Sequence, residues 1–453
     1  MTQEDLSKKL NDLFQSKQSH IVIIPGKPGA GKTTFLKQWM KDKTAIYFRS
    51  DLQHDRIQIP RFSKAVQAHF NQTQPEYPNW DAFFNNVFTL AGKKKKMLII
   101  LDEFPKLLKS NRTFLVTIEK LWEKLAKKYP IMLIMAGSSL PEMNYTHLRL
   151  TGLQSNNPSV ALVPFLPMNF AEFKDRFTSL SFEDAVALYG ITGGTERFVQ
   201  RINPHHTLEQ NVRSFFDHRN FYDFDPKYLF HYDFHDPTTY FSILQILARN
   251  EKKIGVIAKC LDLKTHNLTS FLDRLRDLKV IERILPPTDE NPVISRKGRY
   301  HIVDAFHRFW FRYIYPHQDI LSVDNIDYVW DYFMEKFNLH MKETIIDIIS
   351  EKFQTNPLFP IKNIGPWWNK NKNMDLIITG QNDVILCDIS YNNGPVRYSA
   401  YEKLNQMKEV MEIPRRIKKF HYLFFSNEGF DPDFVHAIRR KKKIYLWSMD
   451  DIK

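Results

Sequence analysis

The chain has 453 residues, of which 43% are hydrophobic and 25% charged, a composition that excludes a disordered chain and, at this length, predicts two to four domains. No apolar run is long enough to span a membrane and the N-terminal residues lack a signal-peptide pattern, so we expect a cytoplasmic protein with no membrane partner. The net charge of +13 predicts an anionic partner, with nucleic acid the obvious candidate, although a lysine-rich surface also forms simply by solvation.

The first predicted strand, at residues 20–24, is a β-branched apolar run that leads into a glycine-rich loop. Residues 34–40 follow with helical spacing, and strand, loop and helix together form the context that a phosphate-binding P-loop requires. We therefore predict an ATP site with Mg²⁺. Its predicted binding residues are Gly26, Lys27, Pro28, Gly29, Ala30, Gly31, Lys32, Thr33 and Thr34.

The residue types of this loop each suit phosphate chemistry. Glycines let backbone N–H groups close around phosphates without Cβ clashes, and the N-terminus of the following helix favours negative charge. Lys32 is expected to contact the β- and γ-phosphates of ATP, and the hydroxyl of Thr33 is expected to ligate magnesium.

A second apolar run, at residues 97–101, predicts a buried strand that ends at Asp102 and Glu103. Ligands bind at the carboxyl ends of the strands in open α/β sheets, so this acidic pair is expected beside the P-loop. Asp102 is predicted to hold magnesium, mainly through water, and Glu103 to polarise the attacking water.

A third apolar strand, at residues 131–135, leads to Ser138. The hydroxyl of Ser138 would either bond the γ-phosphate or the attacking water, or serve as a turn or helix cap. Two further runs, at 45–49 and 160–163, complete a predicted five-stranded parallel sheet with helices on both faces.

Residues 201–236 are rich in aromatic, histidine and aspartate residues and predict a helical lid and linker. In residues 237–305, three amphipathic helices precede two strands around a polar loop, which predicts a winged helix-turn-helix. Such a module either reads double-stranded DNA or serves as a protein-interaction or spacer domain. For DNA, the expected contacts are His266, Asn267 and Arg274 on the third helix, with Arg296, Lys297 and Arg299 on the wing.

These motifs, in this order, resemble the archaeal-type ATPase family of AAA+ and STAND-like P-loop proteins. The resemblance is carried by the P-loop and by six later segments: 101–105, 136–139, 163–173, 189–194, 297–300 and 309–313. It implies an α/β protein with a P-loop ATPase core at 1–200, the lid at 201–236, the winged helix at 237–305, a helical connector at 306–339 and a restriction-endonuclease-like α/β domain at 340–453.

The same resemblance implies roles for single residues. It places Lys32 and Thr33 at the nucleotide, Asp102 and Glu103 at magnesium and water, and Ser138 as the first sensor. Arg197 would be either a second sensor or a solvated helix arginine. The family often has an arginine where this chain has Leu153, with Arg149 as a nearby substitute, so an arginine finger, and the self-association that it would need, stay open.

In the related proteins the C-terminal region resembles the PD-(D/E)xK nuclease fold. An active site of this type uses an aspartate, a second acid and a lysine two positions later. Asp375 and Asp388 match the two acids and Glu343 offers a third carboxylate, but Ser390 stands at the lysine position. We therefore expect a degenerate nuclease site, with Lys403 as the alternative cation.

Together these features predict a magnesium-dependent ATPase that couples its nucleotide state to domain movement, with DNA as a candidate partner. The first alternative is a nucleotide-gated regulatory or defence-type scaffold with little turnover. The second is an ATP-regulated DNA nuclease. A small-molecule kinase is disfavoured because no acceptor-substrate site is evident in the sequence.

Overall fold

The computed structural model describes residues 2–453, except 92–95, 126–127, 153–159, 224–225, 227–236, 250–251 and 292. The chain forms two compact units. The first comprises Met1–Met168 with Thr195–Arg197, and the second comprises Asn169–Gly194 with Phe198–Lys453. The domain limits predicted at 200, 236, 305 and 339 stay predictions.

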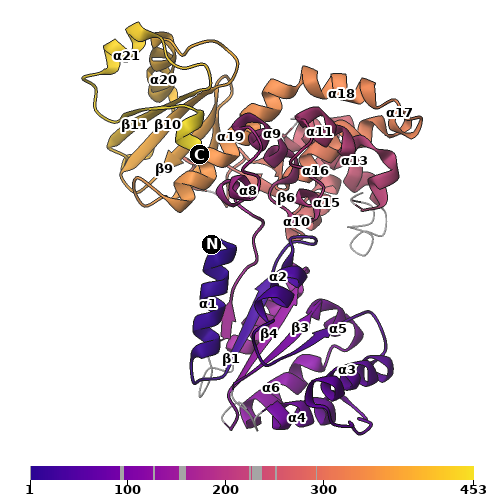
Figure 1. Cartoon of the computed structure of the whole chain (residues 1–453). Coiled ribbons are helices and arrows are strands. Elements are labelled where there is room, and N and C mark those ends of the chain that lie inside the picture. The colour runs from indigo at the N-terminus through magenta and orange to yellow at the C-terminus, as the bar shows by residue number, and fades with distance from the viewer. Residues whose placement is uncertain are drawn as a thin grey trace. The chain divides into compact units, whose positions relative to one another are not determined.

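The first unit is built on a five-stranded parallel sheet with the order β2-β3-β4-β1-β5 (Figure 1). The strands are β1 (His20–Pro25), β2 (Ala45–Arg49), β3 (Met97–Asp102), β4 (Ile131–Gly137) and β5 (Val160–Leu162). The five parallel strands predicted from the sequence are confirmed.

Both faces of this sheet are covered, which explains why its strands carry apolar residues on both faces. In β1, Ile21 and Ile23 join the core on one face, whereas Val22 and Ile24 join the core on the other. One face is covered by α1 (Gln3–Gln15) and α2 (Lys32–Trp39). The other face is covered by α3 (Asp55–Phe70), α4 (Trp80–Ala91), α5 (Phe104–Ser110), α6 (Phe114–Leu125) and α7 (Leu140–Thr151).

The second unit begins with a helical part. Its first elements are α8 (Phe170–Arg176), α9 (Phe182–Thr192), α11 (Leu208–Phe216) and the short helix η1 (His218–Asp223), while α10 (Glu196–Val199) lies at the junction of the units. Later helical elements are α16 (Ala305–Phe309), η2 (Trp310–Ile314), η3 (Tyr315–His317), α17 (Gln318–Ser322), α18 (Ile326–Glu335) and α19 (Phe337–Thr355). Trp310 and Tyr313 are buried, so this aromatic segment is part of the core.

Between these helical elements lie three helices and an antiparallel strand pair. They are α13 (Pro237–Ala248), α14 (Ile254–Cys260), α15 (Thr265–Asp277), β6 (Ile281–Ile284) and β7 (Arg299–Ile302). Leu268, Leu272 and Leu275 form the buried face of α15, which is the 3.6-residue periodicity seen in the sequence. The predicted elements are therefore present, and their interpretation as a winged helix stays a prediction.

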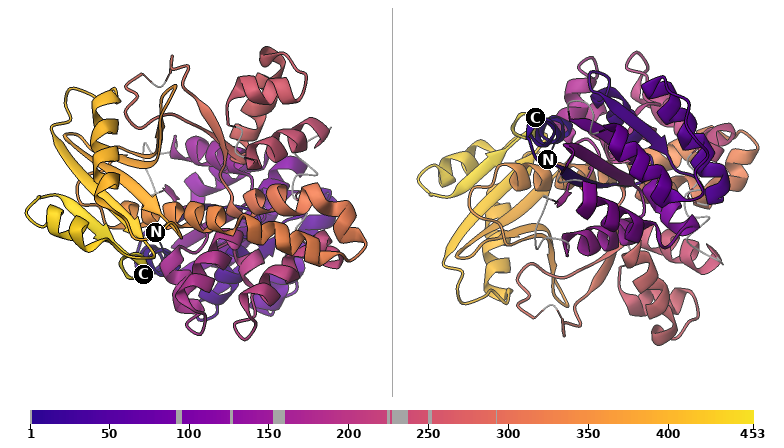
Figure 2. Two further views of the ribbon diagram at one scale, coloured as in Figure 1. Left: turned by 90° about the horizontal axis from the view of Figure 1, so that it is seen from above. Right: turned by 90° about the horizontal axis from the view of Figure 1, so that it is seen from below.

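The chain ends in a second, mixed five-stranded sheet with the order β12-β11-β10-β9-β8, whose strands are orange to yellow in Figure 2. Its strands are β8 (Asn363–Trp368), β9 (Asn373–Thr379), β10 (Asp383–Ser390), β11 (Lys419–Ser426) and β12 (Ile444–Trp447). The pairs β8–β9 and β9–β10 are antiparallel, and the rest are parallel. This part also contains the helices α20 (Tyr398–Val410) and α21 (Pro432–Ile438) and the short helix η4 (Met449–Ile452).

Among the described residues, none of the helices is both long enough and apolar enough to cross a membrane.

Candidate functional site

The loop between β1 and α2 contains the predicted phosphate-binding residues, and three of its positions require glycine. Gly29 and Gly31 have φ angles of 74° and 101°, in the left-handed region that other residues rarely adopt. At Gly26, a Cβ atom would lie 2.7 Å from the carbonyl oxygen of Phe165. The glycine pattern of the sequence thus has a steric cause at each of the three positions.

Lys32 is the first residue of α2, and its ammonium group turns back into the loop. Its Nζ donates hydrogen bonds to the carbonyl oxygens of Gly26 and Lys27, at 2.9 and 2.8 Å, and to Ser138 Oγ at 3.1 Å. Burial lowers the pKa of Lys32 to about 8, while the nearby Glu103 and Asp102 carboxylates oppose that shift. In the part of the chain that the structure describes, this cation has only neutral oxygens as hydrogen-bond partners.

Asp102, at the end of β3, is buried beside the start of α2. Its Oδ2 accepts hydrogen bonds from Thr33 Oγ1 and from the hydroxyl of Tyr47 on β2, both at 2.6 Å, and its Oδ1 accepts one from the backbone N–H of Glu103 at 2.9 Å. Burial and the hydrogen bond to Asp102 raise the pKa of Tyr47. The structure therefore brings the two predicted magnesium residues together and adds a tyrosine that sequence reasoning missed.

Glu103 precedes α5 with a φ of 55°, a conformation that is uncommon for a residue other than glycine and often found at functional sites. Its carboxylate lies 3.6 Å from the Nζ of Lys106, one turn further along the helix. The left-handed backbone turns the chain sharply at the end of β3. Glu103 is thus held at the same sheet edge as Asp102.

The segment Thr195–Arg197 lies against the glycines of the loop. The backbone N–H of Arg197 donates to the carbonyl oxygen of Gly29 at 3.0 Å. A Cβ atom at Gly29 would lie 2.9 Å from Cβ of Arg197, and one at Gly31 would lie 3.0 Å from Cβ of Glu196. The backbone of Arg197 is therefore next to the P-loop, while both interpretations of its side chain, as a second sensor or as a solvated helix arginine, stay predictions.

Comparison with known proteins gives this arrangement a family. A model described as an ATPase domain predominantly from Archaea matches residues 4–201, which contain the whole set of loop, acidic and sensor residues described above. Residues 4–201 of the chain are therefore similar to archaeal-type ATPase domains. A second model, described as archaeal and bacterial proteins of unknown function, matches residues 310–413, outside the ATPase domain.

Two relatives extend the comparison beyond the ATPase domain. An uncharacterized protein of Methanocaldococcus jannaschii is 28% identical over 389 residues, which is 84% of each chain. A solved structure of a Walker-type ATPase of Pyrococcus abyssi has a TM-score of 0.52 at 13% identity, covering 68% of this chain and 95% of the other. The likeness in structure shows that the chain has the fold of such an ATPase.

The sequence offered two positions for an arginine finger, and the structure describes one of them. Leu153 lies outside the described residues. Arg149 on α7 is paired with Glu119, its Nη2 lying 3.1 Å from Oε2 and its Nε also bonded to the same carboxylate. An arginine engaged in this way is held on its own domain. Self-association through an arginine finger stays a prediction.

The DNA-contact candidates in the second unit fall into two groups. On α15, His266, Asn267 and Arg274 are exposed. In the hairpin loop, Arg296 is exposed, but Lys297 and Arg299 are directed at the C-terminal part. Their contacts, described below, are made with residues that sequence reasoning did not connect to the wing.

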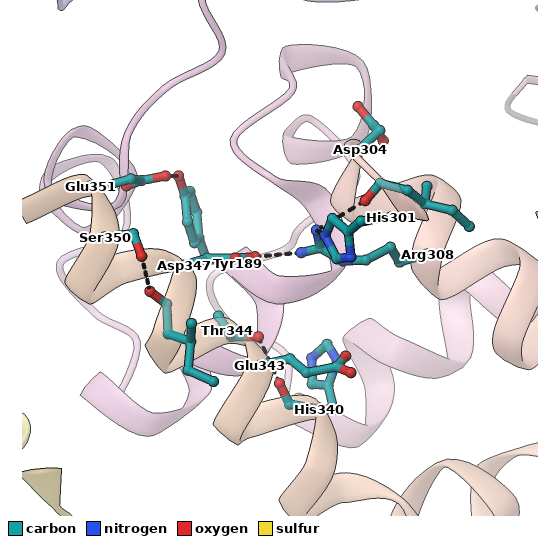
Figure 3. Close-up of polar contacts among 12 residues, drawn as sticks. Tyr189, His301, Asp304, Arg308, His340, Glu343, Thr344, Asp347, Ser350 and Glu351 are labelled. Carbon is teal, nitrogen blue, oxygen red and sulfur yellow. Dashed lines mark hydrogen bonds and ion pairs between the residues drawn. The ribbon is translucent and has the colours of Figure 1, made fainter. Parts of the chain in front are cut away.

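Among the nuclease candidates, Glu343 has an arginine partner. Glu343 on α19 accepts from Nη1 of Arg312 at 2.7 Å. Figure 3 shows Glu343 on the same helix as His340 and as Asp347, whose own partner is Arg308. The strong cation pairing holds the pKa of Glu343 down, at about 2, although burial alone would raise it. Glu343 is therefore committed to Arg312.

Asp375 and Asp388 each have a lysine of their own. Lys342 Nζ lies 2.6 Å from Asp375 Oδ2, and Lys403 Nζ lies 2.9 Å from Asp388 Oδ1. The alternative cation expected from the sequence, Lys403, does reach Asp388. Across the residues that the structure describes, no three His, Cys, Asp or Glu side chains are grouped so that they could hold a metal ion.

Proposed function

We propose that the chain is a magnesium-dependent ATPase that releases phosphate from ATP at the P-loop edge of its parallel sheet. The observation that carries this proposal is the buried ammonium group of Lys32, which has three neutral hydrogen-bond acceptors and no carboxylate partner among the described residues. A buried cation whose hydrogen-bond partners are all neutral favours an anion at the same place. In this position Lys32 would bind the β- and γ-phosphates.

The donor set also suits magnesium. Thr33 Oγ1 and Asp102 Oδ2 are hard oxygen ligands of the kind that Mg²⁺ prefers, and they lie 2.6 Å apart. Bound magnesium would neutralise developing charge on the phosphate oxygens. Tyr47 would orient Asp102 through its hydroxyl, as groups behind a metal ligand commonly do.

The hydrolytic step is assigned to Glu103 and Ser138. Glu103 follows Asp102 directly and would orient and deprotonate the attacking water. Ser138 already shares a hydrogen bond with Lys32 and would bond the γ-phosphate or that water. A nucleotide-gated scaffold with little turnover would use the same binding residues without this step. The ATPase and the scaffold would therefore differ in the rate of ATP hydrolysis and not in the affinity for ATP.

The test is phosphate release from MgATP by the Glu103→Gln variant. We expect Glu103→Gln to bind ATP like the unaltered protein and to hydrolyse it at least about 100-fold more slowly, in the range of lost general-base catalysis. Glu123→Gln, which changes an exposed glutamate on α6, is the matched control and should not alter the rate. Hydrolysis that persists in Glu103→Gln would remove Glu103 from the mechanism.

We also propose that nucleotide binding moves the segment Thr195–Arg197, since it rests directly on Gly29 and Gly31. Phosphates entering the loop would change the contacts of this segment and so transmit the nucleotide state along the chain. Hydrogen exchange of residues 195–197 with and without MgATP tests this step. Equal exchange rates in the two states would contradict it.

Double-stranded DNA is a second candidate partner, favoured by the exposed first turn of α15. The first residues of the third helix are those that reach base edges in helix-turn-helix modules, and His266 and Asn267 occupy them. We expect duplex binding that weakens by about tenfold or more between about 50 and about 200 mM salt and that decreases in Asn267→Ala. Binding without salt dependence, or no binding, would eliminate this candidate.

A further inference from the structure

A pocket of about 630 Å³ lies within the second unit, far along the chain from the P-loop residues. Its walls are the loop of the β6–β7 hairpin, the turn after β8 and the end of α20. A volume of this size is typical of small-ligand sites. The residues of this pocket used below are Lys253, Arg296, Lys297, Arg299, Trp368 and Lys370.

The walls are held together by specific contacts, so the pocket is part of the fold. Lys297 Nζ lies 2.6 Å from Oε2 of Glu412, and Trp368 Nε1 donates to the carbonyl oxygen of Lys297 at 3.1 Å. Further along the hairpin loop, Glu290 is paired with Arg416. These contacts fix the hairpin loop on the C-terminal sheet and explain why Lys297 is not directed outward as a wing residue.

The charge of the lining is strongly positive. Five basic side chains, those of Lys253, Arg296, Lys297, Arg299 and Lys370, face one carboxylate, that of Glu412, which is 83% exposed. Among the described residues, Lys297 is the one member of this group with a carboxylate partner. Four cations around one cavity repel each other, and an anion would relieve that repulsion.

Arg299 and Trp368 form a stacked pair at this site. The guanidinium carbon of Arg299 lies 4.3 Å from the centroid of the Trp368 ring, and the ring is held by its hydrogen bond to Lys297. The Nε of Arg299 is buried without a hydrogen-bond partner among the described residues. Burial also lowers the pKa of Arg299. A desolvated arginine that is oriented by stacking but makes no ion pair is typical of a site for an anionic group.

The chemistry of the pocket combines planar surfaces with cations. Arginine planes and aromatic rings stack on nucleobases, and lysine and arginine side chains bind phosphate. Asn369 and Asn371 also line the cavity and offer both donors and acceptors to a base edge. A carboxylate peptide would use the cations but not the stacked pair. The volume admits one nucleotide and is too small for a duplex.

We propose that this pocket binds a phosphorylated nucleotide unit, either a free nucleotide or the terminal nucleotide of a single strand. The base stacks on the Arg299–Trp368 pair, and the phosphate binds Arg296 and Lys370. The proposal is independent of the ATP site, because none of its residues belongs to the ATPase domain.

The experiment measures binding calorimetrically on the full-length chain carrying Lys32→Ala, so that the P-loop does not contribute. The probes are inorganic phosphate, AMP, dTMP, 5′-phosphorylated hexathymidine and hexaglutamate. The test variant adds Arg296→Gln and Lys370→Gln, two exposed positions at which folding is not at risk. The matched control adds Lys372→Gln, an exposed lysine outside the lining.

We expect a nucleotide or the oligonucleotide to bind at least about tenfold more tightly than phosphate, and the double substitution to weaken that binding about tenfold, with little change in Lys372→Gln. Binding of AMP or dTMP identifies a free nucleotide as the source, and binding of hexathymidine without the mononucleotides identifies a strand end. Equal binding of phosphate or hexaglutamate overturns the proposal. So does the absence of binding, or binding that ignores the double substitution.

Discussion

The carboxyl edges of the two sheets contrast in how their predicted residues are paired. At the parallel sheet, residues from three strand ends bond to one another: Thr33 to Asp102 and Lys32 to Ser138. At the mixed sheet, each carboxylate has its own lysine, Lys342 for Asp375 and Lys403 for Asp388. Among the described residues, the first edge keeps a cation with neutral hydrogen-bond partners for a ligand. The second is already balanced in charge, and so has little to attract a metal ion.

The largest expected effect is at Lys32. Lys32→Ala removes the ammonium group from the predicted phosphate position, and loss of one such charge-stabilising donor typically costs about 100- to 1000-fold in rate. We expect a loss of this size in kcat/KM for ATP, measured by phosphate release. Lys41→Ala, an exposed lysine just after α2, is the control. A loss of less than about tenfold would show that Lys32 does not contact the transferred phosphate.

The pH dependence of ATP binding tests whether the charged ammonium group of Lys32 binds the phosphates. Because burial lowers the pKa of Lys32 to about 8, the amine is charged below that pH and must take up a proton on binding above it. We expect affinity for MgATP to be constant below about pH 8 and to fall by up to about tenfold for each further pH unit. Equilibrium titration with a fluorescent ATP analogue measures it. Lys32→Arg, which stays charged, should lose this dependence, and an unchanged profile in that variant would contradict the assignment.

The contact between Tyr47 and Asp102 allows a test of the predicted magnesium site. Tyr47→Phe removes the hydroxyl that bonds Asp102 and leaves the ring in place. Removing a group behind a metal ligand typically weakens metal affinity or activity by about 10- to 100-fold, so the magnesium concentration for half-maximal hydrolysis should rise about tenfold. Tyr328→Phe, an exposed tyrosine of the second unit, is the control. An unchanged magnesium requirement would mean that Asp102 does not need this partner.

The smallest effect is expected at the mixed sheet. Lys403 is 62% exposed, so its ion pair with Asp388 is screened by water. Lys403→Met should lower the free energy of unfolding by less than about 1 kcal/mol, measured by urea denaturation. Neither the unaltered protein nor this variant should cut duplex DNA with magnesium or manganese. Cutting that disappears in Asp375→Ala would instead show that this edge is an active nuclease site.

Much of the first edge could be predicted from the sequence because its determinants are local. A strand buried on both faces reads as a continuous apolar run. The polar residues that meet at the edge end β3 or follow β1 and β4 in the chain. Tyr47 was missed because its role depends on β2 lying beside β3, which places its hydroxyl at Asp102. No local pattern distinguishes it from other strand tyrosines.

The second unit was harder to predict because its important pairs are distant in sequence. Glu343 looked like a nuclease carboxylate, and its partner Arg312 lies 31 positions away on another helical element. Arg299 looked like a wing contact, but Trp368 stacks on it from a strand of the C-terminal sheet. Tertiary packing decided both roles. The residue types alone did not distinguish a functional carboxylate or arginine from one that packs against another part of the fold.

The most direct test of the central claim is single-turnover release of phosphate from ATP by the unaltered full-length protein, with magnesium and with magnesium removed by chelation. The assigned roles of Lys32, Thr33, Asp102 and Glu103 predict release with magnesium and none after chelation. Tight binding of MgATP with no phosphate release would contradict hydrolysis and favour the nucleotide-gated scaffold, and release that continues after chelation would contradict the metal site.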